Sequence, residues 1–388
     1  MAKYMLSIFI SVKHGINNMN GIDNLKAYAD IFKGKRIGLI TNPSGVDKDL
    51  NYTTDILAQS FNLTALFGPE HGVRGDAQDG KKVEDFMDPI LNIPVYSLHG
   101  KTLHISDEQF SQIDLLAYDI QDVGARYYTY LYTLSYAMED AARNHIPVVV
   151  FDRVNPLGNT IAEGVLLEAE RFKSFVGMYP MPTRYALTIG EYARYINKTF
   201  NIGCDLIVIP CENYKRDTQF KDTGLCWINP SPNIPTQESA LVYIGTCLFE
   251  GTNISEGRGT THPFELIGAP FIDASKLAGS LNAMKLPGIR WRPAHITPMF
   301  SKFANELCHG VQLHITDPIA FRPFEAGLRL FDEIRQNCPE LKFYSGHFDH
   351  LLGTDTVRLG TESIDHIIER AKAESQAFME QTRQFRIY

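Results

Sequence analysis

The chain has 388 residues, 44% of them hydrophobic and 21% charged, and a formal net charge of −8 at pH 7. This length and composition suit a globular protein of two domains and exclude a disordered or fibrous chain. Lysine and arginine are scattered, which argues against nucleic acid or an anionic membrane surface as a partner. No apolar run approaches the roughly 20 residues that span a bilayer, so no integral membrane segment is expected.

The N-terminal segment is the first feature along the chain. Residues 1–12 contain one lysine and a short apolar run, as in the hydrophobic region of a secretory signal. Lys13 and His14 interrupt the stretch in which a small-residue cleavage site would follow. We therefore treat residues 1–20 as a tail or the remnant of a signal-like segment. A periplasmic or secreted location and a cytoplasmic one both remain open.

Short apolar runs alternate with helical patterns between residues 21 and 165. Continuously apolar runs predict strands at 36–40, 63–67, 94–98, 115–120 and 148–151. Apolar residues at helical spacing predict helices at 52–59, 107–112 and 127–144. This alternation predicts an α/β fold, a Rossmann-like, doubly wound parallel sheet covered by helices on both faces. Its ligand site is expected beyond the carboxyl ends of the strands.

The pattern changes after residue 165, where proline-rich loops separate isolated elements. Helices are predicted at 188–197, 323–337 and 362–382, and strands at 206–209 and 311–315. Thr188 and Glu191 have the spacing of a capping box at the start of the first of these helices. We expect residues 166–388 to form a smaller α+β domain, with the active-site cleft between the two domains.

Motifs for cofactors and metals are missing from the sequence. The first strand leads into Thr41-Asn42-Pro43-Ser44-Gly45, which lacks the glycine spacing of a dinucleotide-binding turn, and no Walker-type phosphate loop occurs. The six cysteines lack zinc-finger spacing, and whether they pair is left open. We therefore expect neither a cofactor nor a metal.

The turn after the second strand carries an unusual set of side chains. Phe67 is followed by Gly68-Pro69-Glu70-His71-Gly72-Val73-Arg74. Proline stiffens such a turn and glycine lets a ligand approach, so Glu70 is a candidate general acid with His71 beside it. The structural alternative is a turn carboxylate that caps a helix or pairs with Arg74.

The strand that ends at Tyr118 is also followed by polar residues. Asp119-Ile120-Gln121-Asp122 comes directly after it, and Arg126 lies near the start of the next helix. We interpret Asp119 and Gln121 as functional. Asp122 is undecided, because it could equally cap that helix with Arg126 as its ion-pair partner.

The strand that ends at Phe151 leads into Asp152-Arg153-Val154-Asn155. An arginine fork holds a carboxylate through two parallel hydrogen bonds, so Arg153 could recognise an anionic substituent of a ligand. It could equally clamp neighbouring carboxylates as scaffold, because ion pairs also serve structure.

Two segments of the second domain carry further candidates. Asn233 ends the run Asn229-Pro230-Ser231-Pro232-Asn233, and the glycine-rich run 250–261 contains Glu250, Glu256 and Arg258. One of these acids could be a second carboxylate, with Arg258 as an anion contact. A flexible surface loop is the structural alternative.

This mixture of side chains suits a carbohydrate, because sugar hydroxyls bond to polar groups and sugar faces stack on aromatic rings. Two carboxylates across a cleft are the minimum for glycoside hydrolysis. Glu70 would be the acid, and the second carboxylate would be Asp119, Asp122 or Glu256. The rivals are a noncatalytic sugar-binding protein and a metal-dependent hydrolase, although no ligand spacing supports His71, Asp119 and Asp152 as metal ligands.

The motifs also resemble those of the NamZ-type exo-β-N-acetylmuramidases, from about residue 21 to the C-terminus. The resemblance is carried by 41–45, the Glu70 turn, 119–126, 152–156, 230–233 and 250–260. It implies a Rossmann-like domain joined to a smaller α/β domain. It also implies a bacterial hydrolase that removes terminal β-1,4-linked N-acetylmuramic acid from peptidoglycan fragments. One departure is Tyr185, which stands where the family pattern has histidine.

Binding of the implied substrate requires a cationic side chain, because muramic acid carries a lactyl carboxylate. We expect one or two arginines to bind it, from a set comprising Arg74, Arg126, Arg153, Arg184 and Arg258. The other expected substrate-binding residues are polar members of the same motifs: Asn42, Gln121, Asp152, Asn155, Asn233, Glu250, Asn253 and Thr260.

Overall fold

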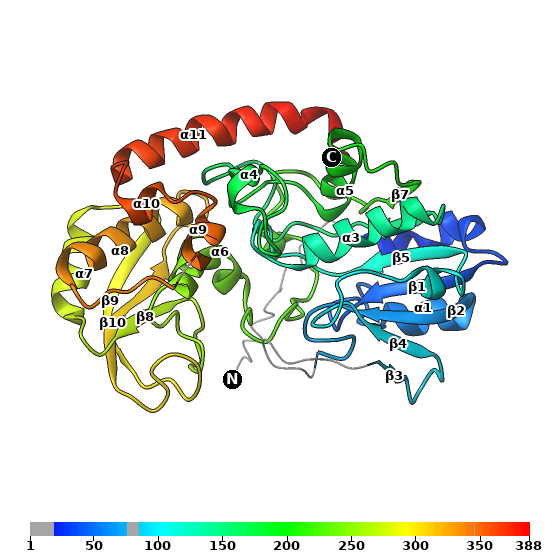
Figure 1. Ribbon diagram of the computed structural model, residues 1–388, viewed down its shortest axis with the longest axis horizontal. Helices are drawn as coiled ribbons and strands as arrows, with labels where there is room; N and C mark the ends of the chain where they lie inside the picture. The colour runs from blue at the N-terminus through cyan, green and yellow to red at the C-terminus, as the bar shows by residue number, and fades with distance from the viewer. Residues whose placement is uncertain (1–18, 76–84, 345) are drawn as a thin grey trace, which may run out of the picture.

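The computed structural model describes residues 19–75, 85–344 and 346–388. The signal-like segment predicted at the N-terminus lies outside these residues, apart from Met19 and Asn20. Figure 1 shows two lobes, each built around its own sheet. A seven-stranded sheet forms the first lobe and a three-stranded sheet forms the second. Within the described residues, no helix is both long and apolar enough to cross a membrane.

The first sheet has the strand order β3-β4-β2-β1-β5-β6-β7. Its neighbours pair in parallel, except that β3 and β4 are antiparallel. The five strands predicted between residues 36 and 151 are confirmed, and β3 was not predicted. The strands are β1 (Arg36–Thr41), β2 (Asn62–Gly68), β3 (Phe86–Met87), β4 (Pro94–Ser97), β5 (Leu115–Asp119), β6 (Val148–Phe151) and β7 (Leu206–Ile209).

Helices cover both faces of this sheet, as predicted for a doubly wound fold. In β1, Ile37 and Leu39 enter the core formed with η1 (Gly21–Ile31) and α1 (Thr53–Ser60). Ile40 enters the opposite core, with α3 (Tyr130–Arg143) and α5 (Ile189–Thr199). Successive strand residues point to opposite faces, so a sheet buried on both sides needs a continuously apolar strand.

The predicted position of one strand is wrong. We expected 206–209 in the second domain, whereas β7 pairs with β6 at the edge of the first sheet, with Val150 opposite Val208. Helix α5 precedes β7 and packs on both strands, so β6, α5 and β7 form one more crossover unit. Because a long proline-rich segment separates β6 from α5, the sequence did not show that α5 and β7 continue the first domain.

The second lobe has an antiparallel sheet of order β8-β10-β9. The helices predicted at 188–197, 323–337 and 362–382 are confirmed as α5, α8 and α11, and Thr188 and Glu191 form the predicted capping box. The elements of this lobe are α6 (Gln237–Thr246), η3 (Cys247–Gly251), β8 (Leu266–Ala269), α7 (Ala274–Ala283), β9 (Ile289–Ile296), β10 (Cys308–Ile315), α8 (Pro323–Asn337), α9 (His347–Leu352), α10 (Thr356–Leu359) and α11 (Ile364–Gln381). Short helices elsewhere are α2 (Asp107–Phe110), α4 (Ala169–Phe172), η2 (Phe220–Asp222) and η4 (Thr382–Phe385).

Helix α11 leads from the second lobe back to the first (Figure 1). It packs on α8, and along its length Glu374 accepts a hydrogen bond from the Leu166 amide at 2.7 Å. The Ser375 hydroxyl donates to the Gly164 carbonyl at 2.9 Å. The chain ends beside α5, where the Tyr388 hydroxyl donates to Asp152 at 2.8 Å. The last helix therefore ties the two lobes together.

A buried arginine makes a second connection between the lobes. Arg126 is fully buried, and its two terminal nitrogens donate to four backbone carbonyls. The acceptors are Val165 at 2.8 Å, Met181 at 2.7 Å, Leu351 at 2.9 Å and Leu352 at 2.7 Å. Arg126 therefore holds three separate segments in one place and is not available to a ligand, contrary to our expectation.

We predict that Arg126→Lys lowers the free energy of unfolding by at least about 3 kcal/mol. A single ammonium group cannot reach four carbonyls arranged for a planar fork, and each buried acceptor left unpaired costs about 1 kcal/mol or more. Urea denaturation followed by circular dichroism measures the change. Arg143→Lys is the control, because Arg143 lies on the surface and its ion pair with Asp140 should contribute at most about 1 kcal/mol. Equal losses in both variants would contradict the role of Arg126.

Candidate active site

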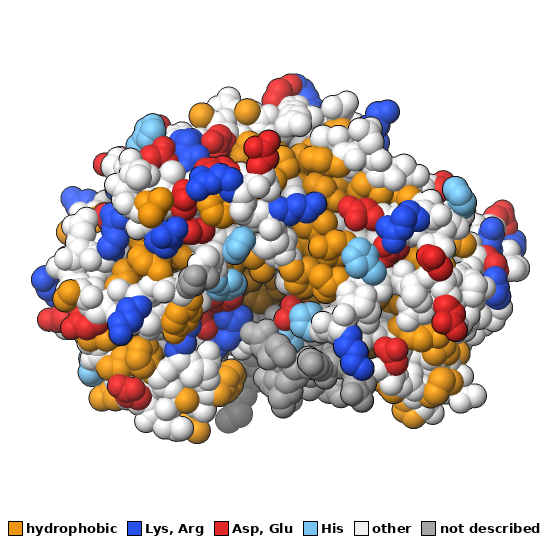
Figure 2. All heavy atoms as spheres, in the orientation of Figure 1, with side chains coloured by type: hydrophobic (Ala, Val, Ile, Leu, Met, Phe, Trp, Pro, Cys, Tyr) orange, Lys and Arg blue, Asp and Glu red, His pale blue; other side chains and the backbone are white. Residues whose placement is uncertain are grey.

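A cavity of about 240 Å³ lies between the two lobes. Figure 2 shows the molecule hollowed between its halves, with hydrophobic side chains deep in the hollow. Both lobes contribute to its wall. The lining residues are Glu70, His71, His99, Tyr127, Tyr128, Thr129, Tyr130, Phe175, Val176, Ser231, Asn233, Ile234, Tyr243, Glu250, Arg258, Phe264, His347 and Leu351.

Glu70 enters the cavity from the turn after β2. The Gly72 amide donates to the Pro69 carbonyl at 2.9 Å, and His71 and Gly72 have φ angles of 70° and 77°. A positive φ is rare for a residue other than glycine, so the backbone at His71 is strained, as is frequent at functional sites. This tight turn directs Glu70 and His71 into the cavity.

The carboxylate of Glu70 has few partners. The Thr129 hydroxyl donates to one of its oxygens at 2.8 Å, and Nε2 of His99 lies 3.8 Å from the other. Arg74, the alternative partner considered from the sequence, is bonded to Asp88 at 2.6 Å. Arg74 does not line the cavity, so the expectation that it binds substrate is not supported.

The second carboxylate of the cavity is Glu250, at the end of η3 in the other lobe. Nη1 of Arg258 lies 2.8 Å from Glu250, and Nε2 of His347 lies 3.8 Å from it. Burial alone would raise the pKa of Glu250, but the Arg258 guanidinium and the contact with His347 outweigh it and hold the pKa at about 2. Glu250 is therefore ionised at neutral pH.

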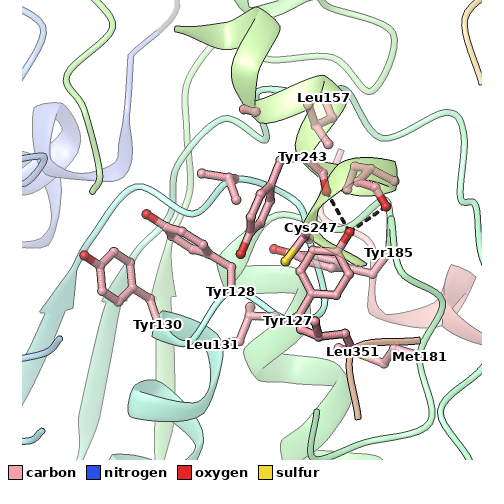
Figure 3. Close-up of a cluster of buried hydrophobic side chains, with 14 of the residues drawn as sticks. Tyr127, Tyr128, Tyr130, Leu131, Leu157, Met181, Tyr185, Tyr243, Cys247 and Leu351 are labelled. Atoms are coloured by element: carbon pink, nitrogen blue, oxygen red, sulfur yellow. Dashed lines mark hydrogen bonds between the residues drawn. The ribbon is translucent and has the colours of Figure 1, made fainter. Parts of the chain in front are cut away.

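Tyrosines form the floor between the two acids. Figure 3 shows Tyr243 of α6 beside Tyr127 and Tyr128, with the Tyr127 hydroxyl bonded to two carbonyls of that helix. The Tyr130 hydroxyl donates to the Pro230 carbonyl at 2.7 Å. Burial raises the pKa of Tyr127, Tyr128, Tyr130 and Tyr243, so the floor is uncharged at neutral pH.

Asp119 and Arg153 occupy a buried ion pair away from the cavity. Nε and Nη2 of Arg153 donate to the two oxygens of Asp119 at 2.6 and 2.8 Å, and Thr53 donates to the same carboxylate. The scaffold interpretation of Arg153 therefore agrees with the geometry, and Asp119 has no oxygen facing the cavity. The expectations that Asp119 is catalytic and that Arg153 binds substrate do not fit this arrangement.

Asp122 and Glu256, the other two candidates for the second carboxylate, are also buried outside the cavity. The Gly124 amide and the Tyr185 hydroxyl donate to Asp122. Arg258 and Lys302 donate to Glu256 at 3.1 and 2.9 Å. Tyr185, the departure from the family pattern, thus bonds to a buried acid and does not line the cavity.

Most other residues expected to bind substrate instead hold loops in place. Asp152 accepts four hydrogen bonds, including those of Thr188 and Tyr388 at 2.8 Å. Each of the rest bonds to nearby backbone or side-chain groups and lies outside the cavity: Asn42, Gln121, Asn155, Arg184, Asn253 and Thr260. Asn42 has an indirect role, because it donates at 3.0 Å to the Pro230 carbonyl just before the cavity residues Ser231 and Asn233.

Five predicted site residues therefore line the cavity: Glu70, His71, Asn233, Glu250 and Arg258. The tyrosine-rich run 127–130 was a usable signal for the floor, whereas nothing in the sequence marked His99 or His347. The ligands of the rival metal site are dispersed, because His71 lines the cavity while Asp119 and Asp152 belong to buried networks. Across the parts of the chain that the structure describes, no cluster of three or more His, Cys, Asp or Glu could hold a metal ion.

The fold and the cavity define a two-domain α/β protein whose two carboxylates, one from each domain, face one small polar-and-aromatic site. A family model described as exo-β-N-acetylmuramidase NamZ, N-terminal, matches residues 37–238. The corresponding C-terminal model matches residues 241–388. The chain belongs to the NamZ exo-β-N-acetylmuramidase family.

Relatives and solved structures agree with this assignment. The chain is 50% identical over 376 residues to the peptidoglycan β-N-acetylmuramidase NamZ of Bacillus subtilis, covering 95% of this chain and 91% of that protein. Crystal structures of two DUF1343 family proteins from Bacteroides fragilis are also similar. The first matches with a TM-score of 0.89 at 35% identity, covering 96% of this chain and 99% of that chain. The second has a TM-score of 0.78 at 30% identity, with the same coverage.

We predict that Asp122→Asn reduces the dependence of stability on pH. Burial raises the pKa of Asp122 to about 7, and one of its oxygens has no hydrogen-bond partner among the described residues. The folded protein keeps a proton that the unfolded chain releases near pH 4, so the free energy of unfolding should fall between about pH 4 and 7. At 1.36 kcal/mol per pKa unit, Asp122 contributes at most about 4 kcal/mol to this fall.

Urea denaturation between pH 4 and 8 tests this prediction. The free energy of unfolding should depend less steeply on pH in Asp122→Asn than in the native protein, because asparagine keeps an acceptor for Tyr185 without the charge. Some slope should remain, because burial also raises the pKa of Asp152, to about 6. Asp49→Asn, at an exposed aspartate, should keep the original slope. An unchanged slope in Asp122→Asn would refute the prediction.

Proposed function

We propose that the protein is an exo-acting glycosidase that releases terminal β-1,4-linked N-acetylmuramic acid from peptidoglycan fragments. Membership of the NamZ family and 50% identity to the Bacillus subtilis β-N-acetylmuramidase support the reaction and the sugar. The observation that carries the proposal is the pair of carboxylates, Glu70 and Glu250, that line one cavity from opposite lobes.

The two carboxylates have different environments, which suit different roles. Glu70 contacts a hydroxyl and an imidazole and has no arginine beside it among the described residues, so we assign to it the role of general acid. It would give that proton to the glycosidic oxygen as the bond to the anomeric carbon breaks. Glu250, kept ionised by Arg258 and His347, would face the positive charge that develops on the sugar ring.

The size and charge of the cavity support an exo-acting enzyme for an acidic sugar. Its volume of about 240 Å³ lies below the roughly 300 Å³ at the lower end of ordinary ligand pockets, so it suits one terminal sugar better than a chain. Arg258 is the one arginine among the described residues that line it, and we assign to Arg258 the recognition of the lactyl carboxylate. The ring of Phe264 lies 5.0 Å from its guanidinium group.

We expect the purified protein to hydrolyse a chromogenic β-N-acetylmuraminide and to leave the corresponding β-N-acetylglucosaminide largely intact. The two substrates differ in the lactyl group, so their kcat/KM ratio reports its recognition. Absence of turnover with both would favour a noncatalytic sugar-binding protein. A preference for the glucosaminide would refute the muramic acid assignment.

Glu70→Gln and Glu250→Gln should each lower kcat at least about 100-fold, the usual contribution of a positioned acid or charge. Glutamine keeps the shape of each side chain but neither its proton nor its charge. Glu108→Gln, at an exposed glutamate of α2, is the matched control and should retain full activity. Near-normal kcat in either cavity variant would remove that residue from the mechanism.

A further inference from the structure

Each carboxylate of the cavity has a histidine beside it. Nε2 of His99 lies 3.8 Å from Glu70, and Nε2 of His347 lies 3.8 Å from Glu250. The two pairs come from opposite lobes and line the same cavity. Their distances are equal, but their remaining contacts differ.

The difference is the presence of an arginine in only one pair. Nη1 of Arg258 lies 2.8 Å from Glu250, and this guanidinium group, together with His347, offsets burial and holds the pKa of this acid at about 2. Glu70 has the neutral Thr129 hydroxyl at 2.8 Å, and among the described residues no lysine or arginine forms an ion pair with it. His99, whose ring lies 3.8 Å from Glu70, is therefore a group that can couple to the protonation of Glu70.

The surroundings of His99 fix which ring nitrogen faces the acid. Its backbone amide and carbonyl both bond to the Ser97 hydroxyl, at 3.3 and 3.0 Å, and its ring packs 6.2 Å from that of Phe175. Nδ1 is buried without a hydrogen-bond partner in the described structure. A buried N–H without an acceptor is costly, so the favoured neutral tautomer carries its proton on Nε2, toward Glu70.

We propose that His99 is a positioning residue that makes Glu70 a stronger acid. When Glu70 gives its proton to the glycosidic oxygen and the bond to the anomeric carbon breaks, a carboxylate remains, and the Nε2–H of His99 donates to it. The distance of 3.8 Å is longer than a hydrogen bond, so this role requires a small side-chain movement that shortens it when the sugar is bound. This inference rests on the proposed glycosidase function.

Other titratable groups also line the cavity near this pair. Burial, and to a smaller extent the negative charge of Glu70, raises the pKa of Tyr128 and Tyr130, so both stay neutral. His71 follows Glu70 in the chain and lines the same cavity. Glu250, Arg258 and His347 face Glu70 from the other lobe. We expect the effect of His99 to be separable from theirs by substitution.

The test compares the pH dependence of kcat in His99→Leu, His99→Gln and the native protein. His99→Leu should lower kcat about tenfold, the size of one hydrogen bond to a charged group, with little change in KM. It should also move the alkaline limb of the profile to higher pH, because a weaker acid keeps its proton longer. His99→Gln retains an N–H donor and should recover most of kcat.

Two further histidines provide matched controls. His347→Gln removes the imidazole beside Glu250, and the alkaline limb should stay in place because this imidazole pairs with Glu250 and not with Glu70. His104→Gln removes an imidazole that pairs with Asp140 at 2.9 Å outside the cavity, and it should change neither kcat nor the limb. A fall in kcat without movement of the limb in His99→Leu would reduce His99 to a structural role and overturn the inference.

A measurement without turnover separates this inference from the proposed function. In an NMR titration, the midpoint of the His99 ring resonances should lie at lower pH in Glu70→Gln than in the native protein, because a nearby negative charge is lost. If the His99 midpoint shifts in Glu70→Gln but neither chromogenic substrate is hydrolysed, the proposed function is overturned and the interaction between His99 and Glu70 stands. If the substrate is hydrolysed but the His99 midpoint does not shift, only the role of His99 is overturned.

Discussion

The arrangement of the cavity depends on one buried guanidinium group. Among the described residues Arg126 forms no ion pair with a carboxylate, and four backbone carbonyls from three segments accept the hydrogen bonds of its two terminal nitrogens. Burying a charge is expensive unless its donors are satisfied, so the three segments are stable only when they meet around it. Two cavity residues adjoin this point: Tyr127 follows Arg126 in the chain, and Leu351 is one of its acceptors. The hydrogen bonds of Arg126 therefore also fix the position of the cavity floor.

The environments of the two cavity acids differ because each lobe supplies its own partners. Glu250 lies among groups of its own lobe, Arg258 and His347, which compensate for its burial. Glu70 lies on a strained turn beside the Thr129 hydroxyl and the His99 imidazole of the first lobe. Two carboxylates in different environments are what acid and charge-stabilising roles require. The boundary between the lobes therefore also separates the two chemical roles that we propose.

Much of the fold was predictable, because a strand buried on both faces is continuously apolar, whereas apolar residues in a helix recur at helical spacing. The start of α3 was not. We expected it at Tyr127, but it begins at Tyr130, since residues 127–129 form tertiary contacts such as the bond from the Tyr127 hydroxyl to α6. β7 was recognised as a strand, but its neighbours depend on the path of the chain and not on its own residues.

The site was only partly predictable, because polar strand ends serve two purposes. Glu70 reaches the cavity, whereas Asp119, Asp152 and Arg153 hold the same sheet edge together. Sequence gives the type and position of these side chains but not the direction in which they point. Glu250 and Arg258 were recognisable from their glycine-rich run. His347 was not, because folding brings it to Glu250 from almost 100 positions further along the chain.

The path of α11 has a consequence for how molecules enter and leave the cavity. This helix packs on the second lobe and bonds to Gly164 and Leu166, and the chain after it places Tyr388 against Asp152, directly after β6. A hinge that opened the two halves widely would have to break these bonds and those of Arg126 together. Exchange of sugar and water should therefore occur through the mouth of a nearly rigid cleft, with side chains rather than whole domains setting its rate.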